Sequence, residues 1–223
     1  MSARLLATLC LVLGSASSSS AQPAAPPDAE LVVYLRTGGN QPGVPLAEMK
    51  RELIALMHQA GYRVAWRSLD GDRGEENDAA QLAVLELNGV CGIAAGYAGI
   101  GHGATGSNRL ATTAITDGRV LPFSSLNCNA LTRSVAQSLA QEAGARRDFL
   151  YGRAMARVAA HELYHVLMRS TEHARAGVAR SCFSTADLLT ERFEFEGATV
   201  ARLRSRLDSA ADAGASGDEA TDR

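Results

Sequence analysis

The chain has 223 residues, 46% of them hydrophobic, and carries a formal net charge of −2 at pH 7. This length and composition are enough for one hydrophobic core of moderate size, so we expect a single folded domain. The 22 basic residues form no block of the kind that follows a phosphate backbone. Nucleic acid is therefore not expected as a partner.

The first residues have the pattern of a secretory signal. Arg4 supplies a positive start, residues 5–13 are largely apolar, and Ser19 and Ala21 are small residues placed as a cleavage site requires. A membrane anchor is the alternative, but a run this short cannot cross a hydrocarbon core that needs about 20 apolar residues. We therefore predict a signal peptide over residues 1–21. The mature protein is expected to be secreted or periplasmic and free of the membrane.

Three segments follow the signal. Residues 22–30 are rich in proline and alanine, which predicts a flexible leader. Residues 31–207 carry the apolar patterning of the folded domain, and its last amphipathic turns are expected around Leu203 and Leu207. Residues 208–223 lack bulky apolar side chains, so we expect a disordered tail.

The domain opens with an alternation of strand and helix. Residues 31–35 are β-rich, a helical pattern then runs from Pro45 to a stop at Gly61, and residues 63–67 form a second β-rich run. This order predicts a β-α-β unit, that is, two parallel strands joined by a right-handed crossover. Residues 82–90 predict a third strand.

A hairpin and a long helix are expected next. Two β-rich runs, residues 110–116 and 120–124, flank an Asp-Gly pair at 117–118, which is the strongest short-range signal for a β-hairpin. The long helix is predicted to start with Asp148 as its N-cap and to end near Arg169. Its pattern is apolar almost all round, which is typical of a helix in the interior of a domain.

The predicted mature chain has three cysteines, Cys91, Cys128 and Cys182. An exported protein meets an oxidising environment, in which three cysteines allow one disulfide and one free thiol. We expect the disulfide to join Cys91 to Cys128, because both cysteines end strand-like segments. In the chain-entropy model, closing a loop of this length stabilises the fold by about 3–4 kcal/mol.

The most informative motif is HExxH at residues 161–165, within the predicted long helix. Positions i and i+4 share one face of a helix, so His161 and His165 can reach one metal ion while Glu162 lies beside it. This arrangement is typical of zinc hydrolases. Two hydrogen-bonded core histidines are the alternative interpretation, but a buried carboxylate next to them is costly unless a cation lies nearby.

A catalytic zinc ion needs three protein ligands and one open position. His173 is the leading candidate for the third ligand, because the chain leaving the helix can turn back and present its imidazole to the same ion. Cys182, Glu191 and Glu194 remain as alternatives. Zinc would lower the pKa of a bound water to about 7, and Glu162 could accept its proton as general base.

At this point the chain resembles the zincin metallopeptidases, and the metzincin branch more closely than the thermolysin-like one. The resemblance rests on the HExxH motif, the downstream His173, and their place behind a β-α-β unit and a hairpin. It implies an α+β fold in which a small mixed sheet precedes a central active-site helix. It also implies that one strand of the hairpin aligns a peptide substrate by strand addition.

The chain also departs from the metzincin pattern HExxHxxGxxH. Met168 replaces the glycine and Thr171 the third histidine, so His173 comes two residues late. No methionine follows Met168, which removes the family's Met-turn, and no tyrosine follows Tyr164 to stabilise an oxyanion. Arg175 and Arg180 are candidates for that role, although surface arginines are the simpler interpretation.

A second motif, at residues 101–106, is that of a nucleotide-binding loop. Residues 101–106, GHGATG, fit the dinucleotide fingerprint GxGxxG, but the residues after them predict a strand where that fingerprint needs a helix. We expect a loop that could lie over the cleft.

The sequence therefore predicts an exported zinc peptidase, acting as an endopeptidase on peptides or proteins, with Zn2+ bound by His161, His165 and His173 and with Glu162 as general base. Two alternatives stay open. One is a zinc-binding interaction module without activity, and the other is a metal-free binding domain in which HExxH is accidental.

Overall fold

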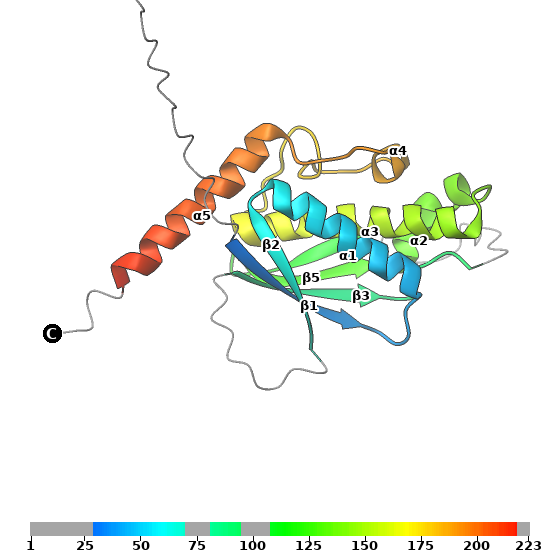
Figure 1. Cartoon of the computed structure of the whole chain (residues 1–223), viewed down its shortest axis with the longest axis horizontal. Helices are drawn as coiled ribbons and strands as arrows, with labels where there is room; N and C mark the ends of the chain where they lie inside the picture. Colours follow the sequence, from blue (N-terminus) through cyan, green and yellow to red (C-terminus); the bar gives the residue numbers. More distant parts are fainter. Residues whose placement is uncertain (1–28, 70–80, 95–107, 218–223) are drawn as a thin grey trace, which may run out of the picture.

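The computed structural model describes residues 29–69, 81–94 and 108–217, and within them the chain forms one five-stranded sheet and five helices (Figure 1). The strands are β1 (Ala29–Thr37), β2 (Tyr62–Ser68), β3 (Gln81–Asn88), β4 (Ala111–Thr116) and β5 (Arg119–Asn127). The helices are α1 (Gly43–Gln59), α2 (Cys128–Leu139), α3 (Gly144–Met168), α4 (Thr185–Leu189) and α5 (Gly197–Gly217). The predicted signal peptide, most of the predicted leader and the GxGxxG segment lie outside the described residues.

The sheet is mixed, with the strand order β2-β1-β3-β5-β4. β1 is parallel to both β2 and β3, and β3 is parallel to β5, whereas β4 runs antiparallel to β5 at one edge. The predicted β-α-β unit is therefore confirmed, since β1, α1 and β2 supply it. The broad prediction of an α+β domain with a small mixed sheet is confirmed as well.

The predicted hairpin is also confirmed and forms β4 and β5. Asp117 and Gly118 connect the strands with φ angles of 51° and 72°. Both angles lie in the left-handed region, which the favoured two-residue hairpin turn requires at both positions. The turn places β4 at the edge of the sheet, where it packs against α3.

Two helices, α1 and α3, pack against each other over one face of the sheet (Figure 1). The alternating side chains of β1 and β3 point into this layer, and they are Leu31, Val33, Leu35, Ala83, Leu85 and Leu87. The backbones of α1 and α3 approach closely at Gly152, where an added Cβ would lie 2.5 Å from the carbonyl oxygen of Pro45. The glycine therefore permits α3 to sit in the interior, as its apolar pattern predicts.

A disulfide between Cys91 and Cys128 confirms the predicted pairing. It connects the segment that follows β3 to the first residue of α2, with a Cα–Cα distance of 4.8 Å. Among the described residues, Cys182 is the free cysteine, and it is exposed. The crosslink therefore ties the end of the sheet to the helical layer.

Several predicted boundaries differ from the structure, among them the start of β1, the start of α3 and the end of the folded domain. β1 begins at Ala29 and so includes the last two residues assigned to the leader. α3 begins at Gly144 rather than at Asp148. The amide of Arg147 donates to the carbonyl of Ala143, so the helical hydrogen bonds already begin before Asp148.

The third difference concerns the predicted tail. α5 continues to Gly217, so residues 208–217 extend a helix that we expected to end near Leu207. Alanine is frequent in this stretch and has the highest helix propensity, which explains the extension without any need for bulky side chains. No helix in the described part of the chain combines the length and the apolar character that a membrane span requires.

Candidate metal centre

The HExxH motif occupies the buried C-terminal half of α3. This helix is enclosed by the sheet, by α1 and by the segments that follow it, so the motif side chains are almost inaccessible. The exposed fractions are 8% for His161, 7% for Glu162 and 8% for His165. The apolar residues around them drive this burial, and the three polar groups then need specific partners.

Each buried histidine is held by a backbone carbonyl. Nδ1 of His161 lies 2.9 Å from the carbonyl oxygen of Val178, and Nδ1 of His165 lies 2.8 Å from that of Ser170. A carbonyl oxygen can only accept, so each Nδ1 must carry the proton. In the neutral rings, Nε2 therefore presents an unprotonated lone pair. Histidines that bind a metal typically donate the N–H of their other ring nitrogen in this way.

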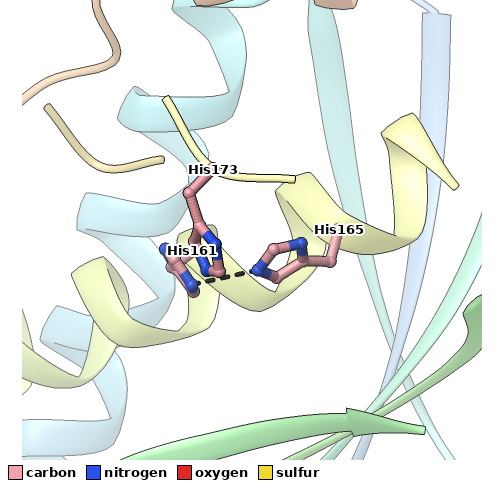
Figure 2. A group of neighbouring side chains, drawn as sticks. All are labelled: His161, His165 and His173. Atoms are coloured by element: carbon pink, nitrogen blue, oxygen red, sulfur yellow. Dashed lines mark hydrogen bonds between the residues drawn. The ribbon is translucent and has the colours of Figure 1, made fainter. Parts of the chain in front are cut away.

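The two lone pairs face each other. Nε2 of His161 and Nε2 of His165 are 3.1 Å apart (Figure 2). A proton between them would require one ring to be charged, but burial lowers the pKa of His161 to about 4 and also lowers the pKa of His165. At neutral pH both Nε2 atoms are therefore hydrogen-bond acceptors, and their lone pairs repel each other. A metal ion bound by both nitrogens would remove this repulsion.

His173 completes the group, as predicted. α3 ends at Met168, and its C-cap residue Arg169 has a left-handed backbone (φ 48°) that turns the chain back toward the helix. The imidazole of His173 then stacks on His161, with ring centroids 5.2 Å apart, and meets His165 edge-on at 4.8 Å. One ligand atom from each histidine lies within 4.8 Å of the others. Figure 2 shows the three rings converging from α3 and from the segment after it.

These residues fit a metal ion. Two histidines bound to one tetrahedral zinc have nitrogen atoms about 3.3 Å apart, which is close to the observed 3.1 Å. Burial also lowers the pKa of His173, so all three imidazoles favour the neutral form that binds metal. Among the described residues, the rival ligands Cys182, Glu191 and Glu194 are not part of this group.

Glu162 is positioned by the sheet as well as by its own helix. Its Oε2 accepts a 2.6 Å hydrogen bond from the hydroxyl of Thr113 on β4, and this hydroxyl lies 2.9 Å from the hydroxyl of Ser124 on β5. Burial raises the pKa of Glu162, while the hydrogen bond from Thr113 opposes the rise. We did not predict Thr113 or Ser124, and nothing local in the sequence distinguishes them from other strand hydroxyls.

The group opens into a pocket of about 620 Å³. Its walls come from the edge strand β4, from α3, from the segment after α3 and from residues 180–183. Phe183 in this last wall meets His161 edge-on, with ring centroids 5.3 Å apart. The three histidines therefore line a pocket that lies between β4 and residues 180–183.

Arg157 anchors α4, the helix that directly follows the pocket-lining residue Phe183. This arginine lies one helical turn before His161 and is fully buried. It donates hydrogen bonds to the carbonyl oxygens of Asp187 (2.8 Å) and Leu188 (3.0 Å) in α4. Burial lowers its pKa to about 10, and Glu52 on α1 opposes this shift from 3.4 Å. α4 begins with a capping box, in which Ser184 and Asp187 bond each other's backbone amides.

The two arginines considered for oxyanion stabilisation differ in position. Arg180 lies in the pocket wall, where its guanidinium contacts Asp187 at 2.8 Å and donates to the carbonyl of Cys182 at 2.6 Å. Arg175 is exposed and does not line this pocket. Only Arg180 therefore stays a candidate, and its charge is already balanced by Asp187.

Comparison of the chain with protein-family models, with curated proteins and with solved structures gives no match. The interpretation of the site therefore rests on its own geometry and on the motif.

Proposed function

We propose that this protein is a zinc-dependent peptidase that hydrolyses peptide bonds, with His161, His165 and His173 as the metal ligands. The observation that carries the proposal is the pair of unprotonated Nε2 atoms 3.1 Å apart, with a third imidazole beside them. Without a cation, the lone pairs of two buried nitrogen atoms face each other, which is unfavourable. Zinc suits three neutral imidazoles better than magnesium or calcium, which prefer oxygen ligands.

The chemistry follows from the ligands and from Glu162. A bound zinc ion would polarise a scissile carbonyl and lower the pKa of a coordinated water to about 7. Glu162 follows His161 directly and lines the same pocket. It accepts the proton of the attacking water and later returns it to the leaving amine. Burial raises its pKa toward the range in which a carboxylate is an effective base.

The edge strand supports a peptide as substrate. β4 is the last strand of the sheet, and no strand in the described residues pairs with its outer edge. Backbone groups along this edge can bind an extended peptide by strand addition, beside the three histidines. This agrees with the expectation drawn from the zincin resemblance.

Export is part of the proposal. The disulfide between Cys91 and Cys128 supports an oxidising compartment, because such bonds are rare in reducing cytoplasm. Together with the signal pattern in residues 1–21, it favours a secreted or periplasmic enzyme.

The test is metal-dependent turnover. We expect purified protein to cleave casein or a peptide library, to lose activity after EDTA treatment and to regain it with zinc. Stoichiometric zinc without turnover would favour the inactive binding module, and the absence of bound metal would favour the metal-free domain.

A further inference from the structure

The hydroxyl groups of Thr113 and Ser124 connect the sheet to Glu162. Thr113 lies on the edge strand β4, and its hydroxyl is 2.6 Å from Oε2 of Glu162. Ser124 lies opposite Thr113 in the register of β4 and β5, and the two hydroxyl oxygens are 2.9 Å apart. Ser124 is only 4% exposed, so this chain of hydrogen bonds starts in the core and ends at the pocket.

The direction of these bonds is determined by the carboxylate. An ionised Glu162 can only accept, so Thr113 must donate its single hydroxyl proton to Oε2. That proton is then no longer available to Ser124. Ser124 must therefore be the donor in its bond with Thr113. Each hydroxyl is oriented by the next group, and hydrogen bonds to a charged acceptor are the stronger kind.

We propose that Thr113, oriented by Ser124, is the positioning residue of the general base and fixes the Glu162 carboxylate in the orientation needed for proton transfer. This inference rests on the proposed peptidase function. The bond occupies Oε2 and leaves Oε1 for the proton of the attacking water. A glutamate has several rotatable bonds, and without this contact its carboxylate would sample other rotamers. Proton transfer requires heavy-atom distances of about 2.6–3.2 Å, which such sampling disrupts.

The chain contains a matched control on the other face of the sheet. Thr112 and Ser125, the neighbours of Thr113 and Ser124, form the same kind of hydroxyl pair at 3.0 Å. Successive side chains of a strand point to opposite faces, so this second pair points away from α3 and Glu162. Loss of the Ser125 hydroxyl therefore removes a comparable cross-strand bond without touching the base.

The experiment measures zinc content, kcat, KM and the unfolding midpoint for the zinc-loaded wild type and four variants. These are Thr113→Val, Thr113→Ser, Ser124→Ala and Ser125→Ala. We expect Thr113→Val to retain zinc and KM within about threefold but to lose about 10–100-fold in kcat, since general base catalysis contributes about 10²–10⁴-fold. Thr113→Ser should restore most of kcat, Ser124→Ala should lose less than Thr113→Val, and Ser125→Ala should match the wild type.

A second readout does not depend on activity. A crystal structure of zinc-loaded Thr113→Val should show the Glu162 carboxylate in a new rotamer or in several, with the three histidines unmoved. The same carboxylate position as in the wild type would overturn the inference.

Three kinetic results would also overturn it. These are a kcat of Thr113→Val within about twofold of wild type, a Thr113→Ser variant as slow as Thr113→Val, and equal losses in Ser124→Ala and Ser125→Ala. If Thr113→Val does not fold, the comparison of the two serine variants decides. A zinc-loaded wild type without turnover defeats the proposed function and this inference together, whereas an active wild type with an equally active Thr113→Val defeats the inference alone.

Discussion

At the level of single residues, the site depends on which ring nitrogen carries a proton. The carbonyls of Val178 and Ser170 hold the protons of His161 and His165 on Nδ1, and both Nε2 atoms are left free to bind a metal ion. Neither carbonyl belongs to α3 itself. The tautomer of both motif histidines is therefore determined by the segments that fold back over the helix.

The role of Glu162 can be separated from metal binding by one isosteric change. We expect Glu162→Gln to retain zinc, because the amide keeps the shape of the carboxylate and is not among the three ligands. Its kcat should fall by about 10²–10⁴-fold, since an amide cannot accept the proton of the water. Zinc analysis and steady-state kinetics on the same preparation check this, and undiminished turnover would remove Glu162 from the mechanism.

At the level of elements, α3 is both the core helix and the helix of the site. Arg157 connects these two properties, because it is buried one turn before His161 and binds the carbonyls of α4. α4 follows the wall that carries Phe183, so a loose α4 would change the pocket. The charge of Arg157 is kept in the core by hydrogen bonds and by Glu52.

Replacement of Arg157 by methionine should destabilise the protein by about 3 kcal/mol, because the buried carbonyl of Leu188, the partly buried carbonyl of Asp187 and Glu52 would lose their donor. Urea unfolding monitored by circular dichroism measures the loss. Arg202→Met is the control, since Arg202 forms an exposed pair with Glu172 at 3.6 Å and should change stability by less than about 0.5 kcal/mol. Equal effects of the two changes would show that Arg157 is not an anchor.

The parts of the fold that the sequence predicted are those with local causes. The i and i+4 spacing of His161 and His165 gives one helix face, and the Asp-Gly pair at 117–118 gives the hairpin. Thr113 was not predicted, because its partner Glu162 lies 49 residues away and the contact depends on where β4 is placed against α3. The partners of Arg157 were not predicted either, because they too are distant from it in the sequence.

His173, the third candidate ligand, was predictable from the sequence only in part. Its distance along the chain made His173 the leading candidate, and Cys182, Glu191 and Glu194 stayed open as alternatives until the turn at Arg169 was known. A left-handed residue at a helix end is usually glycine or asparagine, so the arginine at position 169 did not indicate a turn in the sequence. From the sequence, the residue type of the third candidate ligand was predictable, but its position was predictable only in part.

At the level of the whole molecule, the buried histidines couple stability to pH in the metal-free protein. The pKa of His161 is about 4 in the folded chain, below its ordinary value of about 6.5. The unfolded chain thus binds a proton first as the pH falls, and stability is lost from about pH 6.5 down to about pH 4.

For EDTA-treated protein, this difference predicts an additional loss of about 2 kcal/mol between pH 7.5 and pH 5 in the wild type relative to His161→Gln. The difference between the two proteins cancels groups that both contain, such as Asp187. Burial raises the pKa of Asp187, but the hydroxyl and amide of Ser184, together with Arg180 and Arg157, outweigh this effect and lower it. Urea midpoints at both pH values provide the measurement. Parallel losses in the two proteins would contradict a neutral, buried His161.

The most direct measurement is a zinc titration of the metal-free protein against a chelating dye, for the wild type and for the alanine variants of His161, His165 and His173. We predict one zinc ion per chain in the wild type and an affinity at least about 100-fold lower in each variant. A wild type that binds no stoichiometric zinc, or variants that bind it as tightly as the wild type, would contradict a metal centre built from these three histidines.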